Sequence, residues 1–406
     1  MRQASEPSDA SPPSPDRVYF PELDGLRFVA FLLVFGFHGG FPWLSEAVTL
    51  VTLPLFMVAQ MLGPWAMNRA ADIGPAFGRA ILGNGWVGVQ LFFILSGFLI
   101  TTLLLREEAR FGRVDLKAFW VRRALRIWPL YYLVVALVFF AIPAMDGRLR
   151  DPEHAAMVRH HLPWFLAFLG NWSMIVLGPI PDDRVTILWS VCAEEQFYLI
   201  CPLIVCLVGR RWRPAIVALG MALAVGVRAW VASKGLGRLA ISYNTLAHLD
   251  TMLSGVALAI VLDRFPPGPR AARAAKLWGW AVLAAIVWVM TRGELGHETF
   301  ARRTWDYLAV WATGLGVVLY PMLGPGLPRR ALTFGPVVWL GRISYGLYMY
   351  HEVALDLFRG GTALTTSGSL MALAVTVALA SASYYGFERY FLRLKRSWTR
   401  VPSRPV

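Results

Sequence analysis

The sequence predicts an all-α, polytopic membrane protein with about ten transmembrane helices and both termini in the cytoplasm. Hydrophobic residues make up 57% of the 406 positions and charged residues only 16%, whereas a soluble chain of this length needs more charge to cover its surface. Apolar runs of about 20 residues, long enough to cross a bilayer core, recur along the chain. The basic residues lie mostly in short loops between these runs, where positive charge marks the cytoplasmic side.

Ten strong apolar runs are expected to form the transmembrane helices. They cover residues 24–42, 86–105, 127–143, 187–208, 214–232, 245–262, 277–291, 305–322, 336–357 and 370–391. Two weaker stretches, 47–63 and 163–178, remain. If 163–178 crossed the membrane, the basic cluster Gly209–Arg213 would lie outside, against the positive-inside bias. We therefore interpret both weak stretches as re-entrant or interfacial.

Three regions are expected along the chain. Residues 1–18 form a disordered cytoplasmic tail that is rich in Ser, Pro and Asp and lacks the features of a cleaved signal peptide. Residues 19–393 form the transmembrane domain, and residues 394–406 a basic cytoplasmic tail. The segment 43–84 is an insertion between the first two spans.

Several classes of function are excluded by composition. The net charge of +14 is explained by the positive-inside rule, and no stacking platform or known motif accompanies it, so no nucleic-acid binding is expected. Cys192, Cys201 and Cys206 all lie in one apolar segment. That arrangement excludes a disulfide framework. The three cysteines also lack the spacing that is usual for metal ligands, so no metal site is predicted.

Arg27 and His38 are ionisable side chains within the first span. An ionisable group within a membrane span is a functional-site hypothesis by default because of its cost. These two residues are eleven positions apart, so they share a helix face and are separated by about 16 Å along the axis. Each residue also has an interpretation without a catalytic function. His38 could be hydrogen-bonded at an interface, and Arg27 could anchor the span at the cytoplasmic side.

The fourth span carries two adjacent carboxylates, Glu194 and Glu195. They point about 100° apart on a helix, so they cannot serve one partner together. The expected topology places them in the outer half of the membrane, at the depth of His38.

The ninth span adds a polar stripe. Ser344, Tyr348 and His351 are spaced i, i+4 and i+7, which places them on one face, and Glu352 follows. Three spans thus bring His, Glu and His side chains to a similar depth, and this convergence predicts a buried polar site.

A group of arginines precedes the third span. Arg122 and Arg126 are four positions apart and share a helical face, with Arg123 beside them. Guanidinium forks suit phosphates through bidentate, charge-assisted hydrogen bonds. A plain positive-inside cluster explains the spacing equally well, so both interpretations stay open.

Five segments in this order resemble the membrane-bound acyltransferase-3 family, and the resemblance runs from about Tyr19 to Arg393. They are Leu23–Arg27 with ten residues before His38, Leu91–Ile100, Phe119–Pro129, Trp189–Ser190 through Glu194–Tyr198, and Ile343–Tyr348 followed by His351. The chain departs from the family pattern at Cys192–Ala193, in the Met349–Glu352 ending and in the lack of a proline after Glu388.

The resemblance implies an enzyme that takes an acyl group, commonly acetyl, from cytoplasmic acyl-CoA and transfers it to a hydroxyl. By the match, His38 is the catalytic histidine and Arg27 its accompanying arginine. The basic motif associated with CoA phosphates is Arg122, Arg123 and Arg126. Glu194 and Glu195 are the carboxylates that build the acceptor site or orient the histidine. The residues expected to contact the substrate are Trp189, Ser190, Tyr198, Ser344, Tyr348 and His351.

The expected reaction uses acyl-CoA as a co-substrate and no permanently bound cofactor. The other partners are the lipid bilayer and a hydroxyl-bearing acceptor, which is a carbohydrate, a glycolipid or a glycosylated metabolite. The expected location is a bacterial cell (inner) membrane. A neutral histidine suits the base, with direct attack and an acyl-histidine intermediate both open. The negative charge that develops on the thioester oxygen is expected to be stabilised by Arg27, Ser96 or backbone N–H donors.

The alternative class of function is a multi-pass transporter or flippase for a polar solute. The absence of paired inverted halves in the sequence argues against this alternative.

Overall fold

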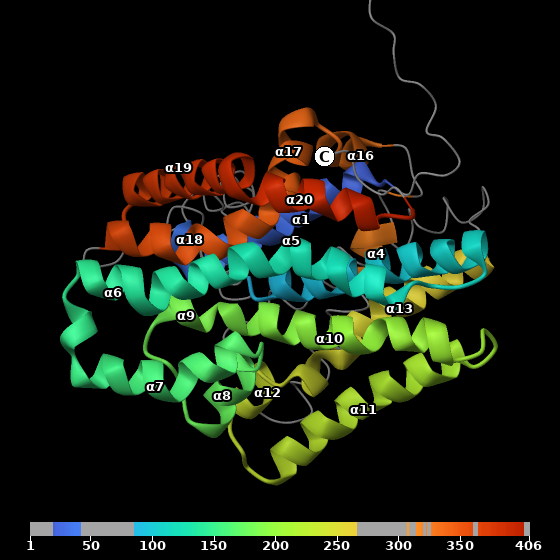
Figure 1. Cartoon of the computed structure of the whole chain (residues 1–406), viewed down its shortest axis with the longest axis horizontal. Coiled ribbons are helices and arrows are strands. Elements are labelled where there is room, and N and C mark those ends of the chain that lie inside the picture. The colour runs from blue at the N-terminus through green and yellow to red at the C-terminus, as the bar shows by residue number, and fades with distance from the viewer. Residues whose placement is uncertain are drawn as a thin grey trace, which may run out of the picture.

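The computed structural model describes residues 19–41, 85–265, 307, 314–319, 322, 326–359 and 364–401. All regular elements in these ranges are helical, and the long helices lie roughly side by side (Figure 1). The all-α prediction is therefore confirmed for the described part of the chain.

Six described helical segments are long and apolar enough to cross a membrane, by length and composition. They correspond to six of the predicted spans, so the protein is a membrane protein. The segments are α4 (Val87–Phe111); α5 (Leu116–Ala136) with η2 (Leu137–Ala141) and α6 (Ile142–Met145); α9 (Asp183–Thr186) with α10 (Leu188–Leu207); α11 (Arg213–Ser233); η4 (Thr245–His248) with α13 (Leu249–Arg264); and α19 (Thr366–Ser383) with η5 (Tyr384–Glu388), α20 (Arg389–Leu394) and η6 (Lys395–Trp398).

Of the other four predicted spans, some fall outside the residues that the structure describes. Residues 277–291 and most of 305–322 lie outside the described residues, as do 47–63 and the predicted tail 1–18. The total of ten spans and the side on which the termini lie therefore stay predictions. The first predicted span is α1 (Pro21–Phe35), which continues as the π-helix η1 (Gly36–Gly40).

The ninth predicted span, 336–357, is two helices instead of one. α17 (Gly335–Arg342) ends at Ile343, where the backbone leaves helical geometry, and α18 (Ser344–Arg359) then begins. α17 packs tightly on α1, because a Cβ on Gly341 would meet the backbone of Asp24. The single-helix prediction was wrong because an apolar run does not reveal a turn between two packed helices. The short α16 (Leu327–Leu332) precedes α17.

The weak stretch 163–178 is also broken. α7 (Pro152–Leu166), which follows the 3₁₀ turn η3 (Arg148–Arg150), and α8 (Gly170–Val176) are separated by a turn at which Phe168 has φ 56°. The seven residues of α8 cover only about 10 Å. This stretch is therefore too short to cross a bilayer as one helix, and its re-entrant or interfacial position stays a prediction.

The loop between the second and third predicted spans, residues 106–126, is much shorter than those spans imply. α4 continues to Phe111 and ends where Gly112 adopts φ 70°, a left-handed conformation that glycine accepts without strain. The side chain of Asp115 accepts a hydrogen bond from the backbone N–H of Ala118 and caps α5. Arg122, Arg123 and Arg126 consequently lie in the first turns of α5.

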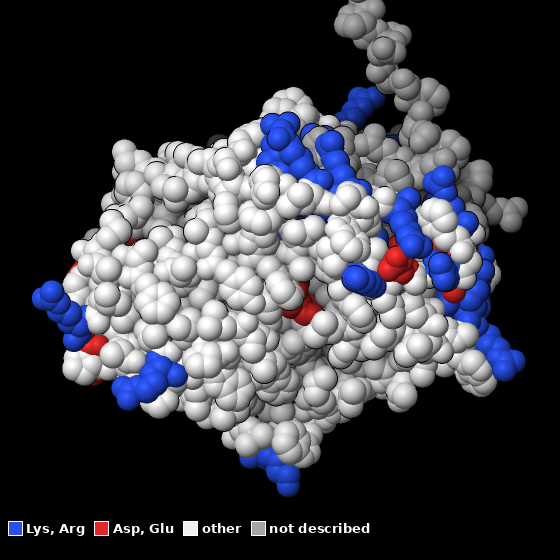
Figure 2. Space-filling view, viewed as in Figure 1, with Lys and Arg blue, Asp and Glu red and all other residues white. Residues whose placement is uncertain are grey.

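Charge is distributed unevenly over the surface. Figure 2 shows a wide face almost without charged side chains, with Lys and Arg gathered mainly toward the end of the molecule where α4 passes into α5. This pattern suits helices whose sides face lipid and whose ends face water.

Glycines bring α4 and α13 into backbone contact. A Cβ on Gly97 would meet the carbonyl of Met252, and a Cβ on Gly255 would meet the carbonyl of Ile94. Small residues allow membrane helices to approach this closely, and such packing stabilises them where the hydrophobic effect between helices is absent. α4 also packs on α1 and α10, so it lies at the centre of the described helices.

Replacing Gly97 or Gly255 with alanine is expected to destabilise the protein. The added methyl group forces the two backbones apart, at a cost of about 1–3 kcal/mol in the free energy of unfolding. Thermal unfolding of the purified protein in detergent measures the effect. The control is Gly226→Ala on α11, where the new Cβ meets no atom within 4 Å. Equal stability of all three variants would show that α4 and α13 do not touch in this way.

Candidate active site

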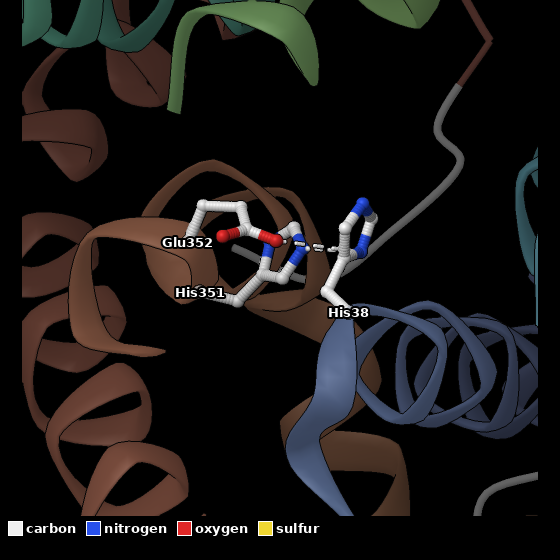
Figure 3. Close-up of side chains that lie close together, drawn as sticks. All are labelled: His38, His351 and Glu352. Atoms are coloured by element: carbon white, nitrogen blue, oxygen red, sulfur yellow. Dashed lines mark hydrogen bonds and ion pairs between the residues drawn. The ribbon is translucent and has the colours of Figure 1, made fainter. Parts of the chain in front are cut away.

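His38 lies at a distorted helix end. The π-helix η1 leaves regular geometry at His38 (φ −81°, ψ 16°) and Gly39 (φ 92°). Single π-helical turns of this kind recur at functional sites because they redirect one side chain out of the helical register. The imidazole of His38 consequently turns toward α18 (Figure 3).

Three groups surround Nδ1 of His38. The carbonyl oxygen of Val34 lies 3.0 Å away, Nε2 of His351 lies 3.3 Å away, and Oε1 of Glu352 lies 3.6 Å away. Figure 3 shows the other ring nitrogen of His38 pointing away from His351 and Glu352.

The hydrogen bonds decide which nitrogen of His38 carries the proton. Nδ1 of His351 lies 2.5 Å from the carbonyl oxygen of Tyr348. Since a carbonyl only accepts, Nδ1 of His351 is the donor and its Nε2 is an acceptor. All three neighbours of Nδ1 of His38 are then acceptors, so Nδ1 carries the hydrogen and Nε2 keeps its lone pair.

Glu352 is completely buried and is compensated by Arg359. Nη1 of Arg359 donates to Oε2 of Glu352 at 3.1 Å, and Nη2 donates to the backbone carbonyl of His38 at 2.6 Å. The same guanidinium lies 4.0 Å from the carboxylate of Asp183. Oε1 of Glu352 has no hydrogen-bond partner among the described residues and faces His38. A protonated His38 would therefore find a counter-charge already in place.

His38, His351 and Glu352 also resemble a metal donor set, with their ligand atoms all within 4.8 Å of one another. Ligation through His38 requires a lone pair on Nδ1, but the Val34 carbonyl at 3.0 Å marks that atom as a donor. Arg359 also puts a positive charge beside the carboxylate. The residues fit proton transfer better than a cation.

The two carboxylates predicted from the fourth span lie elsewhere. Glu194 accepts hydrogen bonds from the hydroxyl groups of Ser96 and Tyr198, the latter at 2.5 Å. Glu195 accepts one from the indole N–H of Trp128 at 2.8 Å. Neither carboxylate makes a described contact with His38. The carboxylate beside His38 is Glu352, whose sequence signal was its position directly after His351 in an apolar run.

Three residues of α10 form a polar stripe that we name the polar seam. Ser190, Glu194 and Tyr198 are spaced four apart, so they share one face of α10 over about 12 Å. At one end, the hydroxyl of Ser190 lies 2.7 Å from that of Tyr348, whose ring is 5.5 Å from the ring of His351. The polar seam thus begins beside the histidine pair.

The two remaining predicted substrate residues, Ser344 and Trp189, lie in different environments. Ser344 is buried on α18, on the face that carries Tyr348 and His351. Trp189 packs instead among aromatic rings, 5.6 Å from Tyr243 and 5.2 Å from His248 between centroids.

The other end of the polar seam reaches the predicted arginines. The guanidinium of Arg123 lies over the rings of Phe119 and Tyr198, at 5.6 and 5.5 Å from their centroids. The charges of Arg126 and Glu194 act on Arg27, which lies 3.5 Å from the carboxylate of Asp24. The structure therefore brings Arg27 together with the arginines of α5, about three helical turns from His38.

Comparison with known proteins identifies the family. The family model described as an acyltransferase domain, acyltransferase family 3, matches residues 20–385. The chain belongs to the acyltransferase-3 family. It is accordingly an enzyme that transfers acyl groups, and the transporter alternative is not favoured.

The curated relatives are longer than the region they share with this chain. The peptidoglycan O-acetyltransferase OatA of Listeria monocytogenes is 26% identical over 93% of this chain and 58% of its own length. The O-acetyltransferase OatA of Staphylococcus aureus is 25% identical over 82% of this chain and 50% of its own length. The chain therefore spans about half the length of these relatives. No solved structure matches.

Replacing Glu352 with glutamine is expected to lower the acyl-transfer rate by roughly 10²–10⁴-fold. The amide keeps the size of the carboxylate but removes the negative charge that stabilises a protonated His38. Turnover of the purified enzyme, measured by release of product, checks the effect.

The matched control is Asp356→Asn, one turn farther along α18, where the carboxylate is half-exposed and pairs with Arg184. Size-exclusion chromatography confirms that both variants fold. Wild-type turnover in a folded Glu352→Gln variant would show that this carboxylate does not support His38.

Proposed function

We propose that this enzyme is a membrane O-acyltransferase that moves an acyl group, specifically acetyl, from acyl-CoA to a hydroxyl of a carbohydrate acceptor. The names of the relatives make a peptidoglycan glycan the first acceptor to test. The proposed location is a bacterial cell (inner) membrane, with the chain crossing it several times.

The observation that carries the proposal is the state of His38. Its Nδ1–H faces only acceptors, so Nε2 presents a lone pair to an incoming hydroxyl. A neutral imidazole with a fixed tautomer is the usual general base for acyl transfer near neutral pH.

The reaction follows from this geometry. Nε2 of His38 takes the proton of the acceptor hydroxyl while the hydroxyl oxygen attacks the thioester carbonyl. The C–S bond then breaks, and the proton passes from Nε2 to the departing thiolate. The products are an ester and free CoA. The same lone pair also suits a transient acyl-histidine, so both routes remain within the proposal.

The arginines at the far end of the polar seam support acyl-CoA as the donor. Guanidinium groups recognise phosphates through charge-assisted hydrogen bonds, and Arg27, Arg123 and Arg126 form a positively charged group there. Since His38 lies about 16 Å from Arg27 along α1, the nucleotide end of CoA would bind at the arginines. The pantetheine arm would follow the polar seam toward His38.

Replacing His38 with alanine is expected to abolish acetyl transfer, a loss of at least about 10²-fold, while acetyl-CoA binding is retained. Calorimetry with acetyl-CoA measures binding, and release of CoA thiol in the presence of peptidoglycan glycan strands measures turnover. His160→Ala, at an exposed position on α7, is the matched control and should behave like the wild type.

Two outcomes would contradict the proposal. Retained turnover in His38→Ala would remove His38 from the chemistry. Failure of the wild-type protein to bind or consume any acyl-CoA would show that the donor is a different molecule.

A further inference from the structure

Arg359 is the last residue of α18 and follows Glu352 by seven positions. Residues seven apart on an α-helix lie on nearly the same face, so both side chains can reach the end of the first helix. The Glu352 side chain is fully buried, whereas that of Arg359 is 29% exposed. Arg359 therefore lies at the boundary between the buried histidine pair and the surface.

One contact of Arg359 holds the backbone at His38. Nη2 donates to the carbonyl oxygen of His38 at 2.6 Å. The last carbonyl groups of a helix lack a partner within that helix, and a cationic side chain is favoured beside them. The bond is made where His38 and Gly39 leave helical geometry. Arg359 thus anchors the turn that directs the imidazole toward α18.

A second contact fixes the orientation of the Glu352 carboxylate. Nη1 of Arg359 donates to Oε2 at 3.1 Å. The other oxygen, Oε1, lies 3.6 Å from Nδ1 of His38 and has no hydrogen-bond partner in the described part of the chain. The carboxylate cannot turn without losing its charge-assisted bond to the guanidinium, so Oε1 stays directed at the imidazole.

The third group beside Arg359 is the carboxylate of Asp183, which belongs to α9. It lies 4.0 Å from Nη1, and its side chain is 68% exposed. An exposed ion pair of this length contributes little to stability, whereas a buried carboxylate that loses its cation is left uncompensated. The contacts with His38 and Glu352 therefore matter more than the contact with Asp183.

We infer that Arg359 is a positioning residue for catalysis, which acts on His38 from two sides, through its backbone carbonyl and through Glu352. The inference rests on the proposed function, in which Nε2 of His38 takes the proton of the acceptor. That step needs the imidazole within hydrogen-bonding reach of the hydroxyl and a counter-charge for the imidazolium. In this role Arg359 touches neither substrate, so its loss changes the rate and spares substrate binding.

The test replaces Arg359 with glutamine in the full-length protein and measures release of CoA thiol from acetyl-CoA, with peptidoglycan glycan strands as the acceptor. The amide keeps a donor group but loses the charge and the planar fork. We expect kcat to fall about 10- to 100-fold, a part of what a general base contributes. The KM for acetyl-CoA should change by less than about twofold. Arg359→Lys retains the charge, and its kcat should lie between those of Arg359→Gln and the wild type.

The matched control is Arg184→Gln. Arg184 also links α9 to α18, through an ion pair of 2.9 Å with Asp356, but it makes no described contact with His38 or Glu352. This variant should keep the wild-type kcat, and thermal unfolding verifies that each variant is folded. In the double variant Arg359→Gln/Glu352→Gln, the loss of kcat should be smaller than the product of the two single losses, because residues that act through one another are not additive.

Several outcomes would overturn the inference. Wild-type kcat in a folded Arg359→Gln variant would remove Arg359 from the reaction. An equal loss in Arg184→Gln would show that α18 needs its ion pairs only for packing. A raised KM with unchanged kcat would make Arg359 a substrate-binding residue, and fully additive losses in the double variant would show that it acts independently of Glu352.

A second measurement needs no substrate and separates this inference from the proposed function. ¹⁵N NMR of histidine-labelled protein in detergent, with His38→Ala to assign the signals, reports the surroundings of the His38 ring nitrogens. These signals should shift in Arg359→Gln and stay in place in Arg184→Gln. Unchanged signals in Arg359→Gln would refute the positioning role even if the donor is acetyl-CoA. If the wild type releases no thiol from acetyl-CoA but the signals shift as expected, the proposed donor fails and the positioning of His38 stands.

Discussion

A charged group can be buried among apolar helices only when another charge or several hydrogen bonds compensate it. In this protein Arg359 provides the clearest such compensation, for the buried carboxylate of Glu352. Its guanidinium binds the buried carboxylate of Glu352 and the backbone carbonyl of His38 at the same time. The two helices that carry the histidines, α1 and α18, are thereby joined at one point. The position of the Glu352 carboxylate beside Nδ1 of His38 depends on these contacts of Arg359.

Much of the architecture could be predicted from the sequence because it depends on apolar length and on the placement of basic residues. Six predicted spans have counterparts among the described helices. The arginines of α5 could be grouped from their spacing. The break at Ile343 and the early start of α5 at Leu116 could not be predicted in the same way. They depend on contacts with other helices and on a local cap, which hydropathy does not report.

The candidate site was predictable in its residue types and less so in its pairings. His38 and His351 were expected to converge, and the structure brings them within hydrogen-bonding distance. Glu194 and Glu195 were expected to build the acceptor site or to orient the histidine, and the structure pairs Glu194 with Ser96 and Tyr198 rather than with His38. Helical spacing shows which residues of one helix share a face. It does not show which face of a neighbouring helix they meet, and that is why Glu352 was missed as the partner.

The arginines of α5 and the histidine pair are both linked to the first helix, since Arg27 lies near the start of α1 and His38 lies in η1, which continues it. This arrangement fixes the distance between them, because a helix is stiff over three turns. A donor that reaches from Arg27 to His38 would meet a rigid separation, so the length of its arm would be a criterion of recognition in addition to its charge.

The π-helix at Gly36–Gly40 makes the position of His38 sensitive to the number of residues in this segment. A π-helical turn holds one residue more than an α-helical turn, so it is equivalent to a single-residue insertion into a regular helix. Deleting one residue between Phe35 and His38 would remove the residue that the wide turn accommodates, so the segment would close into a regular α-helix. The non-helical backbone at His38 and Gly39, which directs the imidazole toward α18, would then be lost. The number of residues between Arg27 and His38 therefore matters for the position of the imidazole as much as their identity does.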